Sequence, residues 1–287
     1  MKVFFNLVKF SHTIFALPFA LVGFGLGNMI STESFSWSKL LLVLGCMVTA
    51  RNTAMAFNRY IDRDIDAANA RTKVREIPSG LISENKVLVF IITNAILFVA
   101  LTWFINPLCF YLSPVALLVI MGYSLTKRFT FLCHLILGIG LSLAPVGAFI
   151  AVTGYFHFLP IILGFAVLFW VSGFDIIYAL QDESFDQSKG LFSIPAYFGT
   201  QKALNISRIF HIVSATLMVI FLYESHQLLN SIFLFTMIGT LIFIGLLFSQ
   251  HKLVRPNDLS KVNLAFFTNN GIASLLYGVL FLIDIWL

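Results

Sequence analysis

Charge is scarce in this sequence. Only 11% of the 287 residues are Asp, Glu, Lys or Arg, whereas 59% are hydrophobic. Soluble globular domains carry about 25% charged residues. Together with a mean hydropathy of +0.93, this shortage excludes a soluble fold, a disordered chain and a nucleic-acid-binding protein. It indicates an all-α integral membrane protein that crosses the bilayer several times.

Cysteine and histidine are also scarce. Cys46, Cys109 and Cys133 lie in apolar runs without paired spacing, so we expect neither a disulfide nor a metal knuckle. The six histidines lack the H-x-x-x-H spacing that would predict a zinc site. These absences exclude a disulfide framework and a zinc enzyme.

Apolar runs of membrane-spanning length recur along the chain. The first begins near residue 14 and is about 17 residues long, so we interpret it as a membrane helix rather than as a cleaved leader. The runs predict nine transmembrane helices, near residues 14–30, 39–57, 87–105, 108–125, 132–153, 158–181, 207–224, 228–248 and 264–286. We expect them to form a single domain over residues 1–287.

The basic residues are distributed unevenly over the predicted loops. If the N-terminus and every second loop share one side, all Lys and Arg residues except Lys39 and Arg51 lie on that side. The positive-inside rule places this side in the cytoplasm. Nine spans then put the C-terminus on the outer side. We expect the protein in the inner membrane of the cell, with its active site facing the cytoplasm. The two long loops, 58–86 and 182–206, fall on the cytoplasmic side, and long ordered loops usually carry function.

Acidic residues gather at the cytoplasmic ends of two predicted spans. Asn58, Asp62 and Asp66 follow an i, i+4, i+8 spacing, which puts them on one helix face. Asp182 and Asp186 repeat this spacing after the sixth span, and Asp175 lies seven residues earlier. The two spans are an even number of crossings apart, so both acidic faces are expected on the same side of the membrane.

Such a concentration of like charge needs a physical reason. Carboxylates one turn apart repel each other, and a membrane boundary adds a desolvation cost. Mg²⁺ prefers oxygen ligands and bridges substrate phosphates, so two facing acidic helices predict a site for Mg²⁺ and one diphosphate. The alternative is a solvated helix end with local Arg–Asp pairs. We favour it only for Asp64 and Glu183, which point away from the acidic faces.

A third polar cluster lies at the cytoplasmic end of the fourth span. Tyr123 and Lys127 are spaced i, i+4. The lysine would pair with a diphosphate oxygen, and the tyrosine would donate a hydrogen bond to the leaving group. The pattern equally fits an interfacial tyrosine with positive-inside anchors.

These motifs, taken together, resemble a known family. They read Asn58-x-x-x-Asp62-x-x-x-Asp66, then Tyr123-x-x-x-Lys127, then Asp175-x-x-Tyr178-Ala-x-x-Asp182-x-x-x-Asp186. In this order they are similar to the UbiA superfamily of intramembrane aromatic prenyltransferases, and the resemblance covers nearly the whole chain. One departure is Arg59, where many members have Asp.

Two further stretches narrow the resemblance. Residues 10–20 and 50–59 look most like 4-hydroxybenzoate polyprenyltransferases, and equally like relatives from the futalosine route to menaquinone. The resemblance implies nine helices around a central cavity, with a cytoplasmic cap that holds a Mg²⁺-bound polyprenyl diphosphate. We expect no protein partner. His12 lies in the first stretch, and we interpret it as an interfacial residue, with a place near the acceptor pocket as the alternative.

The resemblance also implies roles for individual residues. The expected Mg²⁺ ligands are Asp62, Asp66, Asp182 and Asp186, with help from Asn58. The expected substrate contacts are Arg51, Asn58, Arg63, Lys127, Tyr178 and Lys189. Asp175 or Asp182 would orient the aromatic acceptor or remove its ring proton, and Tyr123 would assist departure of the leaving group.

Arg51 is the residue whose role is most open. It lies seven residues before Asn58, on nearly the same face but deeper in the membrane. A guanidinium binds a carboxylate through a planar fork of donors, so Arg51 is a candidate partner for an aromatic acid. A structural ion pair with Asp66 or Asp175 is the alternative.

The implied activity is Mg²⁺-dependent transfer of a polyprenyl group to a 4-hydroxybenzoate-like acid in quinone biosynthesis, through an allylic cation. A naphthoate of the menaquinone pathway is the alternative acceptor. A rival of another class is a transporter with an intramembrane acidic relay. Transporter acids are expected near the bilayer midplane, whereas these acids lie at one rim.

Overall fold

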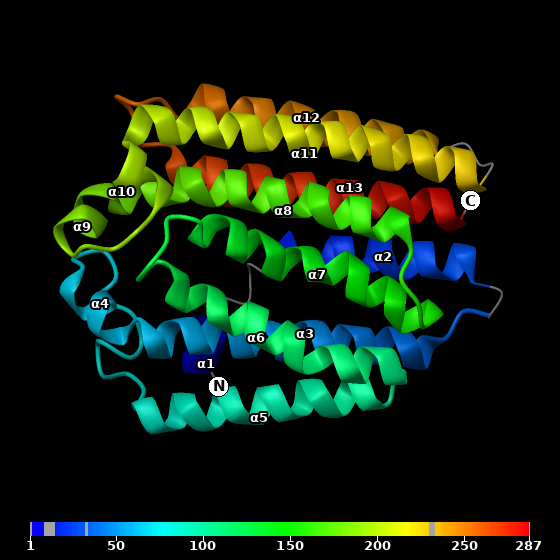
Figure 1. Ribbon diagram of the computed structural model, residues 1–287, viewed down its shortest axis with the longest axis horizontal. Helices are drawn as coiled ribbons and strands as arrows, with labels where there is room; N and C mark the ends of the chain where they lie inside the picture. The colour runs from blue at the N-terminus through cyan, green and yellow to red at the C-terminus, as the bar shows by residue number, and fades with distance from the viewer. Residues whose placement is uncertain (1, 9–14, 32–33, 230–232, 287) are drawn as a thin grey trace. The chain divides into compact units, whose positions relative to one another are not determined.

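The computed structural model describes residues 2–8, 15–31, 34–229 and 233–286, and within these ranges its regular structure is helical (Figure 1). His12 lies outside them. The helices are α1 (Lys2–Leu7), α2 (Leu17–Ile30), α3 (Trp37–Ile61), α4 (Arg63–Ala68), α5 (Glu84–Trp103), α6 (Pro107–Thr126), α7 (Cys133–Thr153), α8 (Phe158–Ala179), α9 (Glu183–Ser188), α10 (Ile194–Phe198), α11 (Thr200–Leu229), α12 (Leu234–Leu253) and α13 (Asn270–Trp286). A 3₁₀ turn, η2 (Leu180–Asp182), follows α8, and a π-helix, η3 (Leu264–Asn269), precedes α13.

Eight helices in the described ranges are long and apolar enough to cross a membrane. They are α3, α5, α6, α7, α8 with its extension to Ser188, α11, α12 and the segment Leu264–Trp286. The first predicted span corresponds to α2, an apolar helix of 14 residues. The chain is therefore a multi-pass membrane protein, while nine crossings and the orientation of the termini stay predictions. The three cysteines are free, as expected.

The helix ends differ from the predicted ones where polar residues continue a helix. Helix α11 begins at Thr200 rather than near 207. Its first turns carry polar residues such as Thr200, Gln201 and Lys202, which a hydropathy criterion leaves out of a span although a helix includes them. The predicted loop 182–206 therefore contains α9, α10 and the start of α11, and the predicted loop 58–86 contains α4. Helical structure in both loops gives the acidic residues a defined backbone.

The chain divides into two compact units. Unit 1 comprises Met1–Thr13 and Trp37–Leu125, and unit 2 comprises Ile14–Ser36 and Thr126–Leu287. Within unit 1, α3 packs along α5, and the Asn52 side-chain amide donates to Asn94 Oδ1 across 3.0 Å. A small buried cluster that includes Leu7, Ala56 and Val87 holds α1 and α5 against the end of α3 that continues into α4.

Unit 2 is built around α8. Helices α7 and α11 flank α8, and a large aromatic core that includes Phe19, Trp170 and Tyr277 joins it to α2, α12 and α13. The α2–α7 contact requires a glycine, because a Cβ at Gly23 would lie 2.1 Å from the carbonyl oxygen of Pro145. At one end of α8 the chain turns through η2 into α9 and α10 (Figure 1). This end carries the acidic residues of unit 2.

Candidate active site

The first acidic cluster follows the end of α3. Asp62 stands between α3 and α4 with φ −90° and ψ 4°, a conformation in the sparsely populated bridge region. The helix is interrupted there, but Asp62 N still donates to Asn58 O and Asp66 N to Asp62 O, at 3.0 and 2.7 Å. The backbone therefore keeps its i, i+4 hydrogen bonds from Asn58 to Asp66 through the break.

The carboxylates of this cluster are buried. Asp62 is 1% exposed and Asp66 3%, so neither carboxylate lies on a solvated helix end. The Asn58 amide donates to Asp62 Oδ2 at 3.2 Å and to Ser124 Oγ of α6 at 3.3 Å. Burial of a carboxylate is costly unless it is paired, so this cluster requires cationic or hydrogen-bonding partners.

Arg75 supplies one such partner. Its Nη1 donates to both oxygens of Asp66, at 2.7 and 2.8 Å. Arg59, 7% exposed on α3, lies within electrostatic range of Asp66 and Tyr123. Arg75 was not among the predicted site residues, because its pairing with Asp66 spans nine positions and has no local spacing signal. An arginine therefore balances the charge of Asp66.

Two predicted substrate contacts in unit 1 have other neighbours in the structure. Arg63 Nε lies 2.9 Å from Glu84 Oε2, and its guanidinium covers the Tyr60 ring at 4.9 Å. Arg51 Nη2 donates to the Val8 carbonyl at 3.5 Å and lies within electrostatic range of Tyr123. Asp66 itself pairs with Arg75, and an ion pair of Arg51 with Asp66 or Asp175 stays a prediction.

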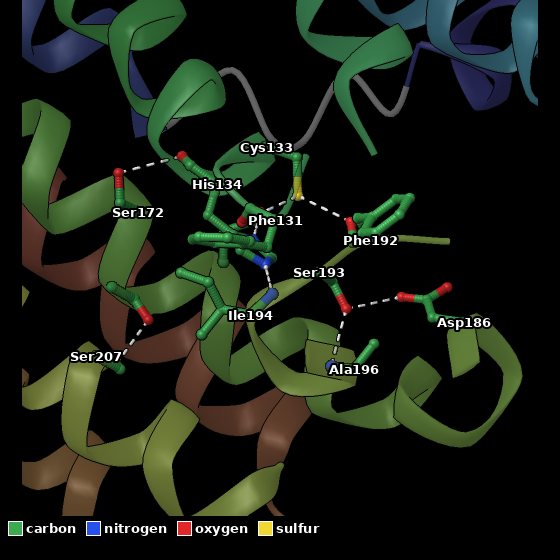
Figure 2. Close-up of polar contacts among 12 residues, drawn as sticks. Phe131, Cys133, His134, Ser172, Asp186, Phe192, Ser193, Ile194, Ala196 and Ser207 are labelled. Carbon is green, nitrogen blue, oxygen red and sulfur yellow. Dashed lines mark hydrogen bonds and ion pairs between the residues drawn. The ribbon is translucent and has the colours of Figure 1, made fainter. Parts of the chain in front are cut away.

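The second acidic cluster has the same local construction. Asp182 stands immediately before α9 with φ −107° and ψ 3°, as Asp62 stands before α4. Between Asp175 and Asp186 the α-helix tightens into the 3₁₀ turn η2 at Leu180–Asp182 before α9 begins. Asp186 accepts a 3.0 Å hydrogen bond from Ser193 Oγ (Figure 2). Asp186 also lies within electrostatic range of Asp182 and Lys127.

The remaining predicted residues of unit 2 differ in how close they come to this cluster. The backbone of Lys127 accepts a 2.7 Å hydrogen bond from Phe192 N, which holds this lysine near the segment leading to Ser193. Lys189 is exposed on the turn after α9. The Tyr178 ring packs on Phe266, with ring centroids 4.2 Å apart. Of these three, Lys127 has the clearest electrostatic link to the acids.

Asp175 is paired with a histidine that the sequence analysis missed. His134 Nδ1 lies 2.7 Å from Asp175 Oδ2, and its Nε2 lies 3.3 Å from the backbone nitrogen of Ile194. The sequence carries no local signal for this contact, because the two residues are 41 positions apart. Asp175 is thereby held by α7 as well as by its own helix.

The acidic side chains are of the type that binds a hard cation with oxygen ligands. Within the described ranges no group of three or more His, Cys, Asp or Glu side chains is placed to hold a metal ion. Each unit contributes two acids one turn apart, and Asp66 already binds the cationic side chain of Arg75. Carboxylate pairs with an amide nearby are the ligand type of Mg²⁺. The residues therefore match the expected ion in chemistry.

The described fold and acidic turns are those of an all-helical, multi-pass membrane protein with paired carboxylates at the ends of its helices. A family model described as the UbiA prenyltransferase family matches residues 16–271, a range that runs through both units. The chain belongs to this family and is a prenyltransferase. This assignment confirms the resemblance and decides against the transporter.

Similar proteins are known in sequence and structure. A 4-hydroxybenzoate octaprenyltransferase of Tolumonas auensis is 28% identical over 243 residues, 85% of this chain and 83% of that protein. A 4-hydroxybenzoate octaprenyltransferase of Nitrosomonas eutropha is 30% identical over 239 residues, which are 83% of this chain and 81% of that protein.

Solved structures share the fold. The apo structure of a UbiA homologue from Aeropyrum pernix K1 has a TM-score of 0.84 at 27% identity and covers 95% of this chain and 98% of that one. A UbiA homologue from Archaeoglobus fulgidus bound to DMAPP and Mg²⁺ has a TM-score of 0.75 at 21% identity, with 99% of each chain covered. At that identity the likeness concerns the fold alone.

Proposed function

We propose that this protein transfers a polyprenyl group from polyprenyl diphosphate to a 4-hydroxybenzoate-like aromatic acid, in a Mg²⁺-dependent step of ubiquinone or menaquinone biosynthesis. The observation that carries the proposal is the pair of similarly built acidic turns, Asp62–Asp66 and Asp182–Asp186. The names of the curated relatives and the ligands of the Archaeoglobus structure support the choice of substrates.

The residues divide the proposed chemistry between them. Asp62, Asp66, Asp182 and Asp186 would hold Mg²⁺ with help from Asn58, and the bound ion would neutralise the diphosphate so that it becomes a good leaving group. Lys127 contacts diphosphate oxygens, with Lys189 and Arg63 at the edge of the site. Tyr123 donates a hydrogen bond to the departing oxygen, and Tyr178 lines the substrate pocket.

Departure of the diphosphate leaves an allylic cation. The electron-rich ring of the acceptor attacks this cation, a carbon–carbon bond forms, and the ring proton passes to a carboxylate. Asp175 or Asp182 takes this proton or orients the acceptor. The reaction takes place in the inner membrane, within a cavity enclosed by nine helices and open to the cytoplasm, as the distribution of basic residues predicts.

The experiment that tests the proposal is transfer by the purified protein in detergent. Radiolabelled polyprenyl diphosphate is offered with 4-hydroxybenzoate, dihydroxynaphthoates or futalosine-derived naphthoates, with Mg²⁺ or with a chelator. We expect labelled 4-hydroxybenzoate product only with Mg²⁺. A protein that prenylates only a naphthoate would place it in menaquinone synthesis, and one that prenylates no aromatic acid would overturn the proposal.

Arg51 tests how the acceptor is held. Lysine keeps the positive charge but loses the planar fork of donors, so Arg51→Lys should raise the KM for the aromatic acid and leave the KM for prenyl diphosphate unchanged. If both KM values rise together, Arg51 shapes the cavity instead. Steady-state kinetics with each substrate varied in turn make the distinction.

A further inference from the structure

His134 is a buried polar residue that the proposed chemistry has not yet used. It lies at the start of α7 and is 2% exposed. Each of its ring nitrogens has a separate partner. Nδ1 lies 2.7 Å from Asp175 Oδ2. Nε2 lies 3.3 Å from the Ile194 backbone nitrogen (Figure 2). One imidazole therefore connects α8 with the beginning of α10.

These partners assign a donor or an acceptor role to each ring nitrogen. A backbone N–H can only donate, so Nε2 must accept the hydrogen bond from Ile194 and carries no proton. The other nitrogen then bears the hydrogen of the neutral imidazole, and Nδ1–H donates to the Asp175 carboxylate. A donor at this place fixes the direction of the Asp175 oxygens.

The packing of α7 against α8 holds the ring in place. Ser172 Oγ donates to the backbone oxygen of His134 at 3.1 Å and to that of Leu168 at 2.7 Å. One turn further along α7, a Cβ at Gly138 would lie 2.5 Å from the Leu168 carbonyl oxygen. The two helices are thus in close contact beside His134.

The same imidazole is linked to Asp186. Ile194, which donates to Nε2, directly follows Ser193. Ser193 Oγ accepts from Ala196 N at 3.2 Å, so it caps α10, and it donates to Asp186 Oδ2 at 3.0 Å (Figure 2). Asp175 and Asp186, at the two ends of the second acidic cluster, are therefore both tied to the first turn of α10.

We propose that His134 is a positioning residue for the aromatic acceptor: its neutral Nδ1–H tautomer holds Asp175 as an oriented carboxylate while its Nε2 anchors α10. The inference rests on the proposed function, because it assigns to Asp175 the aromatic acid rather than the diphosphate. Asp175 then presents a fixed acceptor for the acid's hydroxyl or ring proton.

Two amide substitutions distinguish the roles of the two ring nitrogens of His134. Asparagine carries its amide on Cγ, at the branch that bears Nδ1, so His134→Asn keeps a donor for Asp175 and loses the acceptor for Ile194. Glutamine places its amide one carbon further, at the reach of Nε2, so His134→Gln keeps the acceptor and loses the donor. The proposal requires the glutamine variant to be the slower one.

The measurement is steady-state transfer with each substrate varied. We expect His134→Gln to lose about tenfold or more in kcat/KM for the aromatic acid, the range found for residues that orient a catalytic group, and to keep its KM for prenyl diphosphate. His134→Asn should stay within about threefold of the wild type. His157→Asn is the matched control, because His157 caps the opposite end of α8.

Other results would overturn the proposal. Equal losses in the Asn and Gln variants, an unaffected Gln variant, or a parallel rise of both KM values would each mean that the contact with Asp175 does not position the acceptor. A wild-type protein that prenylates no aromatic acid would instead overturn the proposed function and, with it, the acceptor role.

An independent readout needs no turnover. Nitrogen-15 NMR of histidine-labelled protein should show a neutral histidine signal protonated at Nδ1 that is present in the wild type and absent from His134→Asn. If the signal lost in the variant belongs to a ring protonated at Nε2 alone, the hydrogen bond to Asp175 is wrongly assigned, whatever the kinetics. His134→Gln serves for the same comparison if His134→Asn fails to fold.

Discussion

At the scale of single residues, the acidic cluster of unit 1 is built from buried carboxylates rather than from water-exposed ones. Asp62 and Asp66 are almost inaccessible, whereas Asp64 between them is exposed. Neighbouring residues of one type therefore differ completely in environment. This contrast provides a matched pair of substitutions.

Asp62→Asn should reduce turnover by about a hundredfold or more, since a neutral amide cannot contribute charge to a cation site. Asparagine has nearly the same volume and still accepts from Asn58, so the melting temperature should change little. Asp64→Asn is the control and should keep wild-type activity. An Asp62→Asn protein that is folded and retains more than about a tenth of the rate would contradict metal ligation by Asp62.

Arg75 permits a test that does not require catalysis. Removing one partner of a buried ion pair costs about 3–5 kcal/mol, less where one side chain is partly exposed as Arg75 is. Arg75→Gln should therefore lower the melting temperature, and added Mg²⁺ should restore more stability to the variant than to the wild type, because the ion replaces the guanidinium on Asp66. Thermal unfolding with and without Mg²⁺ measures this. Lys73→Gln, on an exposed neighbour, should show no such difference.

At the scale of elements, the two acidic turns repeat one construction. In both, a long helix ends, one aspartate adopts a bridge conformation, and a six-residue helix follows with a second aspartate one turn on. The motifs Arg75-Glu76-Ile77-Pro78 and Phe192-Ser193-Ile194-Pro195 follow these helices. The repeated construction is thus followed in both places by an Ile-Pro motif.

A different helix end shows how a distant residue stabilises an element. Asp284 of α13 accepts from the backbone nitrogens of Phe235 and Thr236, at 3.1 and 2.6 Å, and so caps α12 from outside that helix. Asp284→Ala should destabilise the protein by about 1 kcal/mol without changing either KM. Asp284→Asn keeps one acceptor oxygen and should lose less. Denaturation in detergent, combined with kinetics, would reveal any unexpected effect on catalysis.

At the scale of the whole molecule, the two acidic clusters belong to different compact units. If both serve one reaction, their losses should not add. The double variant Asp62→Asn/Asp182→Asn should be about as slow as the slower single variant, because residues that act as a unit are strongly non-additive. Additive losses in the same transfer assay would mean that the clusters act independently.

The sequence alone determined the features that depend on local spacing. Hydropathy located the long helices, since a span requires some 20 apolar residues and little else. The i, i+4 motifs located Asp62, Asp66, Asp182 and Asp186 and identified the family, because a helix converts that spacing directly into a shared face. Hydropathy did not locate the polar first turns of α11, because charged residues lower the mean hydropathy of a segment.

Only the tertiary structure decided which partners these acids have. Arg75 on Asp66 and His134 on Asp175 follow from chain turns and helix packing, which no spacing rule encodes. Likewise we expected Arg63 to contact the substrate, and the structure places Glu84, at the start of α5, 2.9 Å from its Nε. The physical reason is that a buried charge takes its partner from whichever segment the fold places beside it, at any distance along the chain.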